Sequence, residues 1–205
     1  MINRVSTNAL RHSTKAEIRT RVRTETRRLT ADERSNGSER VSQLLVQQQV
    51  WREARTLLMF SPLKDEVNVW PLGLQALREG KIVGLPRFVE EDNSYNASRV
   101  EDLEESLDTG RFGIREPRSN APAIPLKQLD LVLVPAVAFD LCGARLGRGH
   151  GYYDRLLAHV CGIRCGVAFD QQIVDELPAE PHDISMDVIV TPTRWMTFDQ
   201  DLASE

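Results

Sequence analysis

The sequence predicts a single α/β domain with a three-layer α/β/α, Rossmann-like architecture and a mainly parallel sheet. Two features of the 205-residue chain lead to this prediction. Stretches with the pattern of strands alternate with stretches with the pattern of helices. Residues 131–137 form an almost unbroken apolar run, which is typical of a strand buried on both faces in the middle of a parallel sheet. A glycine-rich turn and the start of a helix follow this run, so we expect the sheet to be organised around it.

The N-terminal half is expected to hold helices and strands in alternation. We expect residues 1–12 to be a disordered tail and the domain to extend over 13–198. Capping boxes predict the starts of two helices, at Thr14 with Glu17 and at Thr30 with Glu33, the second helix running towards Trp51. A third helix is expected at 70–79 and ends before Gly80. Strands are expected at 55–60, 81–85 and 94–100.

The C-terminal half is expected to continue the alternation. A proline-rich linker at 118–127 leads to the central strand. Beyond it we expect, in order, a helix at 151–159, a strand at 165–169, a short helix from 170 to about 178, and a last strand at 186–192.

Composition narrows the class of protein. A net charge of −4 argues against a generic nucleic-acid-binding protein, which normally carries a basic excess. No apolar run approaches the roughly 20 residues that span a bilayer, and no secretory signal is visible. The cysteines are odd in number and match no zinc spacing, so free thiols in a reducing cytoplasm are expected (Cys142, Cys161 and Cys165).

The turn at 143–151 has the composition of an anion site. Its four glycines permit close approach of backbone N–H groups to a ligand, and a helix begins at its end. Arg145 and Arg148 add forked donors suited to phosphate oxygens, and Asp154 could hold a divalent cation against those phosphates. A flexible surface turn explains the glycines alone equally well, but not the arginines, tyrosines and aspartate together.

The run from Asp130 to Arg155 closely resembles the signature of 5-formyltetrahydrofolate cyclo-ligases, also called methenyltetrahydrofolate synthetases. The similarity is carried by R-L-G-R-G-x-G-Y-Y-D, which stands here at 145–154. The resemblance implies that this stretch binds ATP and that Asp154 contributes to a Mg²⁺ site. Arg148 would clamp the transferring phosphoryl group, and His150 stands at a variable position of the motif. The implied ATP-binding residues of the loop are Arg145, Leu146, Gly147, Arg148, Gly149, His150, Gly151, Tyr152 and Tyr153.

The same resemblance extends over roughly 15–192 and implies further site residues. Lys15 and, more weakly, Arg19 would reach the phosphates, and Asp187 would be a second Mg²⁺-associated acid. His182 and Asp183 match a frequent pair of the family, although a hydrogen-bonded turn explains them better. The implied folate-binding residues are Ser61, Glu66, Phe88, Phe112 and Tyr153.

Two points stay open at this stage. Phe88 and Phe112 could form an aromatic wall for a pterin ring, but core packing explains them about as well. Asn68 and Val69 depart from the acid and threonine usual in the family after Glu66.

The resemblance implies an ATP- and Mg²⁺-dependent cyclisation of 5-formyltetrahydrofolate to 5,10-methenyltetrahydrofolate, with release of ADP and phosphate. The expected partners are a reduced folate and ATP, without nucleic acid or membrane, in a monomer or homodimer. One alternative is a paralogue with the same loop and another small-molecule substrate. The other is a non-catalytic nucleotide-binding module.

Overall fold

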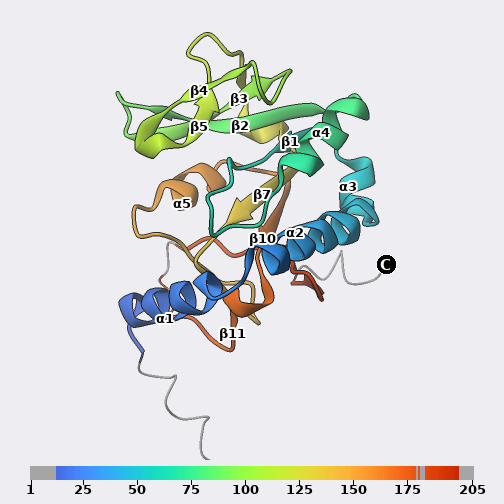
Figure 1. Ribbon diagram of the computed structural model, residues 1–205. Helices are drawn as coiled ribbons and strands as arrows, with labels where there is room; N and C mark the ends of the chain where they lie inside the picture. The colour runs from blue at the N-terminus through green and yellow to red at the C-terminus, as the bar shows by residue number, and fades with distance from the viewer. Residues whose placement is uncertain (1–12, 179, 181–182, 199–205) are drawn as a thin grey trace, which may run out of the picture.

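The computed structural model describes residues 13–178, 180 and 183–198, and Figure 1 shows a central sheet with helices around it. The sheet has eight strands in the order β13-β12-β10-β7-β1-β2-β3-β6. The five inner strands from β12 to β2 are parallel, whereas β13, β3 and β6 pair antiparallel at the two edges. Their bounds are β1 Thr56–Leu58, β2 Ile82–Val89, β3 Ser94–Val100, β6 Ala123–Ile124, β7 Leu131–Pro135, β10 Ile163–Val167, β12 Val188–Val190 and β13 Trp195–Thr197.

Helices and short 3₁₀ turns connect these strands. The α-helices are α1 Lys15–Arg27, α2 Ala31–Val46, α3 Gln49–Glu53, α4 Trp70–Arg78 and α5 Tyr152–Leu157. The 3₁₀ helices are η1 Arg111–Gly113, η2 Leu126–Gln128 and η3 Asp170–Gln172.

Two small sheets complete the described chain. The first, in the order β11-β8-β9, consists of β8 Ala138–Asp140, β9 Arg145–Leu146 and β11 Ile173–Val174. The second is the antiparallel pair of β4 Leu107–Thr109 and β5 Arg115–Pro117. In Figure 1, β4 and β5 lie with β2 and β3 at the top, α1 lies at the bottom, and α5 lies between them.

The core occupies both faces of the sheet because successive side chains of a strand point to opposite sides. On one face, Leu131 and Leu133 of β7 pack in a cluster with α2, α3 and α4. On the other face, Val132 and Val134 pack with Leu156 and Leu157 of α5. Layers of helix, sheet and helix therefore surround β7, which confirms the predicted α/β fold.

Many of the expected elements are confirmed. Both capping boxes are present, with the Thr14 and Thr30 hydroxyls each accepting from the backbone N–H three residues later. Gly80 follows α4 with φ at +75°, as a residue that ends a helix. The central strand and the strand at 94–100 also lie where the sequence predicts them.

Other expectations are wrong in detail. The second helix ends at Val46, and Trp51 belongs to the separate helix α3. The short helix expected from 170 to 178 is one 3₁₀ turn followed by β11, because Ile173 and Val174 pair with β8 instead. The expected disordered tail at 1–12 lies outside the described residues. Within the described part of the chain, no helix is long and apolar enough to cross a membrane.

Candidate functional site

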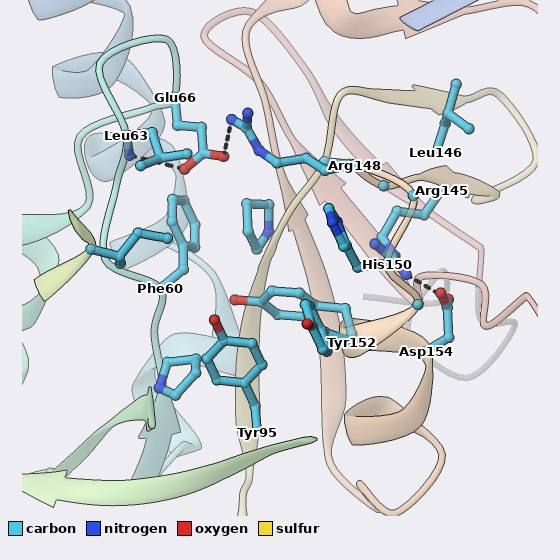
Figure 2. A pocket seen from close by; sticks show the side chains of 18 of the residues that line it. Phe60, Leu63, Glu66, Tyr95, Arg145, Leu146, Arg148, His150, Tyr152 and Asp154 are labelled. Carbon is cyan, nitrogen blue, oxygen red and sulfur yellow. Dashed lines mark hydrogen bonds and ion pairs between the residues drawn. The ribbon is translucent and has the colours of Figure 1, made fainter. Parts of the chain in front are cut away.

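A cavity of about 660 Å³ lies at the carboxyl edge of the parallel sheet (Figure 2). Phe60 and Ser61, which follow β1, line it together with Pro135 and Ala136 at the end of β7. Ligands of open α/β sheets bind at this edge, outside the carboxyl ends of the strands. The cavity has the size of a small-molecule site.

The glycine-rich turn forms one wall of this cavity from Arg145 to Asp154. Its first two residues form β9, which pairs with β8 and anchors the turn to the domain. Gly149 and Gly151 have φ of +107° and +64°, where side-chain-bearing residues are strained. Helix α5 begins at Tyr152 and has only six residues. So short a helix adds little dipole charge, and the positive charge at the cavity comes mainly from the neighbouring arginine and lysine side chains.

Helix α1 adds a row of cations that faces the glycine-rich turn. Lys15, Arg19 and Arg23 are spaced by four residues, which places them on one side of the helix, and all three line the cavity. Nε of Arg19 donates to the Gly147 carbonyl at 2.8 Å and so fixes the turn to α1. Burial, and then the charge of Arg148, lower the pKa of Arg23. A cluster of like charges of this kind is stabilised by a bound anion.

Sequence reasoning missed Arg23, although the four-residue spacing from Lys15 and Arg19 was a signal that could have found it.

The structure places Lys15 in contact with two acids, Glu180 and Asp183. Its Nζ lies 2.9 Å from Asp183 and 3.2 Å from Glu180. Burial lowers the pKa of Lys15, but the hydrogen bonds to Asp183 and Glu180 outweigh this effect and leave it raised.

Arg148 and Glu66 meet across the cavity, and Figure 2 shows their contact as a dashed line. The guanidinium lies 2.8 Å from Glu66 and 3.3 Å from Asp65. The other carboxylate oxygen of Glu66 accepts from the backbone N–H of Leu63 at 3.0 Å. Burial raises the pKa of Glu66, and these hydrogen bonds offset only part of that effect. The sequence assigned these two residues to different ligands, and the structure brings them together.

Arg145 forms an ion pair with Asp154 nine residues further along the chain. The Arg145 side chain is buried, while that of Asp154 is partly exposed and lines the cavity. Arg145 thus orients the carboxylate that the sequence assigned to a metal.

Aromatic rings form a further part of the cavity wall. Tyr95, Tyr152 and Tyr153 line the cavity together with Phe60. Tyr95 and Tyr152 contact edge to face, with ring centroids 5.2 Å apart. Burial raises the pKa of Tyr153, so its hydroxyl stays protonated at neutral pH. Tyr95 is a further residue that sequence reasoning missed.

The position expected for Phe88 is corrected by the structure. Phe88 is buried and contacts Tyr95 and Tyr152 edge to face at 5.3 and 5.8 Å, and it is not among the described residues that line the cavity. It supports the aromatic wall from behind because its ring packs against both tyrosine rings and under the Arg111 guanidinium. The Phe112 side chain and His182 lie outside the described part of the structure.

Asp187 does not lie at the cavity, which corrects the predicted metal site. It directly precedes β12, at the amino-terminal edge of the sheet, and its carboxylate pairs with Arg164. The acid that lines the cavity in its place is Asp183. No group of three or more His, Cys, Asp or Glu residues in the described ranges is arranged to hold a metal ion.

Three further residues noted in the sequence are His150, Asn68 and Val69. His150 lines the cavity and stacks on Tyr152 with an interplanar angle of 2°. Asn68 accepts a hydrogen bond from the Trp70 N–H at the start of α4, and Val69 is fully buried. The departure from the family motif at these two positions therefore falls outside the described cavity lining.

This fold and cavity define an α/β protein whose cavity is lined by lysine and arginine side chains together with aromatic rings. The chain belongs to the 5-formyltetrahydrofolate cyclo-ligase family, whose sequence profile matches residues 11–192.

Known proteins of this family resemble the chain in sequence and in structure. A 5-formyltetrahydrofolate cyclo-ligase of Mycolicibacterium smegmatis is 46% identical over 92 residues, which cover 43% of this chain and 47% of that protein. The 5-formyltetrahydrofolate cyclo-ligase of Escherichia coli is 36% identical over 149 residues, covering 69% of this chain and 80% of that protein. The NMR structure of Aquifex aeolicus 5,10-methenyltetrahydrofolate synthetase superposes with a TM-score of 0.82 at 36% identity, covering 91% of this chain and 93% of that one.

Proposed function

We propose that this protein converts 5-formyltetrahydrofolate to 5,10-methenyltetrahydrofolate with consumption of ATP and release of ADP and phosphate. The contact between Arg148 and Glu66 carries the proposal. It joins a phosphate end, formed by the glycine-rich turn and the α1 cations, to an aromatic end suited to a pterin. The names of the related proteins support the same reaction.

The chemistry explains the residues present. The formyl oxygen is a poor leaving group until it attacks the γ-phosphorus of ATP and displaces ADP. N10 of the same folate then attacks the formyl carbon, the oxygen leaves as inorganic phosphate, and N10 loses its proton. Phosphoryl transfer of this kind requires alignment and charge neutralisation more than covalent help from the protein.

Arg148 is placed to neutralise charge on the transferring group because it stands between the glycine-rich turn and Glu66. Lys15, Arg19 and Arg23 add positive charge along α1, towards the phosphates. Glu66 lies at the boundary with the aromatic end, where its carboxylate can accept from an N–H of the folate. Tyr95 and Tyr152 offer ring edges and faces to the pterin.

A bound Mg²⁺ would neutralise phosphate charge. Asp154 and Asp183, which both line the cavity, are the carboxylates that we propose to hold it. Two carboxylates suit Mg²⁺, which takes its other ligands from phosphate oxygens and water.

A paralogue with another small-molecule substrate is the second candidate. It was motivated by Asn68 and Val69, and neither residue is among the described lining of the cavity. Asn68 instead accepts a hydrogen bond from the first N–H of helix α4 and Val69 packs in the core, so these two residues give no reason to expect another substrate. We propose a cytoplasmic location in agreement with the free cysteines.

The test of function is a spectrophotometric assay of methenyltetrahydrofolate formation from 5-formyltetrahydrofolate with ATP and Mg²⁺. Product is expected in one-to-one proportion with ADP, and ATP turnover without folate conversion would refute the proposal. Substrate labelled with ¹⁸O in the formyl group tests the mechanism. The label is expected in inorganic phosphate, whereas label in water with unlabelled phosphate would exclude phosphorylation of the formyl oxygen.

A further inference from the structure

A buried carboxylate with one unused oxygen lies in the wall of the cavity. Glu116 of β5 is 6% exposed and is among the lining residues. Its Oε1 has no hydrogen-bond partner among the residues that the structure describes. A buried polar atom without a partner is costly, so such an atom in a cavity wall indicates a ligand that supplies the missing donor.

The chain holds this carboxylate in a fixed orientation. Oε2 of Glu116 accepts from the backbone N–H of Phe88 at 3.0 Å. Gly110 leaves room for the acid, because a Cβ at this position would lie 2.5 Å from the Glu116 carboxyl carbon. Oε2 is therefore held by the backbone of β2, whereas Oε1 has no partner among the described residues. A side chain placed in this way has the preorganisation of a binding group.

The surroundings of Glu116 combine positive charge with an aromatic surface. Burial raises the pKa of Glu116, and the hydrogen bond from the Phe88 N–H and the charges of Arg87 and Arg111 offset only part of that effect. Tyr95 is close enough that the Glu116 charge, after burial, contributes to raising the pKa of Tyr95 to about 12. A carboxyl acceptor with positive charge near it therefore lies beside a ring on which a flat heterocycle can pack.

The position of Glu116 selects between the two ends of the cavity. Figure 1 shows β5 at the opposite side of α5 from α1, which carries Lys15, Arg19 and Arg23. The phosphates of a nucleotide belong at the cationic end, and a carboxylate repels them. What fits Glu116 is a neutral, planar ring with N–H donors on one edge.

The pyrimidine ring of a reduced pterin has such an edge, formed by its N3–H and its 2-amino group. Arg148 of the glycine-rich turn reaches Glu66, and we place the meeting point of the formyl group and the γ-phosphate at this contact. A pterin held by Glu116 at its pyrimidine edge would direct its other ring, which carries the formyl group, towards Arg148.

We propose that Glu116 is a specificity-determining residue that accepts hydrogen bonds from the N3–H and 2-amino edge of the pterin. This assignment rests on the proposed function and adds a second carboxylate to the folate site, at the end opposite the phosphates.

Glu116→Gln tests this role because glutamine keeps an oxygen for the Phe88 N–H and replaces the free acceptor with a donor. The KM for 5-formyltetrahydrofolate is expected to rise roughly tenfold to hundredfold, the range for a hydrogen bond to a charged group. The KM for ATP is expected to stay within about twofold. Glu101→Gln is the matched control, since Glu101 is exposed and paired only with Arg99 in the described structure.

A substrate analogue that lacks the 2-amino group separates contact from a structural effect. The wild-type protein should lose affinity for this analogue, and Glu116→Gln should lose little more, because the interaction is already absent. Equal losses in both proteins would overturn the proposal, as would an unchanged folate KM or a rise confined to the KM for ATP. Glu116→Asp keeps the charge but shortens its reach, and it serves the same test if the glutamine variant does not fold.

The control for the underlying function is the wild-type protein itself. If it forms methenyltetrahydrofolate and Glu116→Gln matches it, only the Glu116 assignment fails. If the wild-type protein fails to convert 5-formyltetrahydrofolate, the proposed function fails, and the pterin assignment falls with it.

Discussion

Replacing Arg148 with alanine is expected to lower kcat by about 10²-fold or more. The guanidinium lies between the glycine-rich turn and Glu66, where charge develops during phosphoryl transfer. Loss of one preorganised donor to such a charge costs about 2.7–4 kcal/mol of transition-state stabilisation. Arg148→Lys should restore little of this, because an ammonium group lacks the forked geometry that contacts Glu66 and phosphate together.

The effect on stability should be much smaller than the effect on rate. The Arg148 side chain is 40% exposed and that of Glu66 is 9% exposed, so solvent screens part of their interaction. We expect a loss of about 1 kcal/mol, as for an exposed ion pair, instead of the several kcal/mol for a fully buried one. For a chain of this length, about 1 kcal/mol lowers Tm by roughly 2–4 °C.

Steady-state kinetics and thermal unfolding of the same preparations distinguish these effects. Arg118→Ala is the matched control, because Arg118 is an exposed arginine that lies 3.6 Å from Asp108, away from the cavity. Near-normal kcat in both Arg148 variants would remove this residue from the mechanism. A loss of rate that follows the unfolded fraction would assign it a structural role only.

Three further perturbations test other parts of the site. Glu66→Gln should raise the KM for folate, whereas Asp154→Asn should raise the Mg²⁺ concentration for half-maximal rate, and a swapped pattern would invert our assignment of the two subsites. Burial raises the folded-state pKa of Glu66, so its contribution to stability is complete below the unfolded pKa and is lost as pH rises through the folded pKa. The Tm of wild type minus that of Glu66→Gln should therefore fall across this window, and a pH-independent difference would contradict the burial of the carboxyl group. Gly149→Ala forces a side chain into φ of +107°, at a strain of about 1–3 kcal/mol, and should raise the KM for ATP, whereas an unchanged KM would show that the turn tolerates another conformation.

Local patterns in the sequence were sufficient for much of the fold. The capping boxes at Thr14 and Thr30 depend on contacts three residues apart, and Gly80 ends α4 by its own backbone conformation. The apolar run of β7 also predicts a buried strand, since its side chains are apolar on both faces, and all four residues from 131 to 134 are fully buried. The glycine-rich turn was predicted as part of the site because its arginines, tyrosines and aspartate stand together in one short segment that resembles a family signature.

The pairing of site residues was decided by the tertiary structure. Asp183 and Asp187 are both aspartates and lie four residues apart, so the sequence alone does not show which of them reaches the cavity. Asp187 directly precedes β12 and so lies at the edge of the sheet opposite the cavity, while Asp183 lies beside Lys15. The edge at which a residue lies depends on where its strand begins, and strand boundaries are set by pairing with distant segments.

The sequence by itself therefore determined the α/β fold and the position of the glycine-rich turn after the central strand, because both follow from residues close together in the chain. Only the tertiary structure decided that Phe88 supports the aromatic wall from behind, and that Tyr95 and Glu116 enter the cavity. Neighbouring residues of a strand point to opposite faces, so a shift of one position exchanges an inward for an outward side chain. The register of β2 with β3 pairs Phe88 directly with Tyr95 and so places both rings on one face of the sheet, and the register of β4 with β5 pairs Glu116 with Asp108, through backbone hydrogen bonds that the sequence does not show.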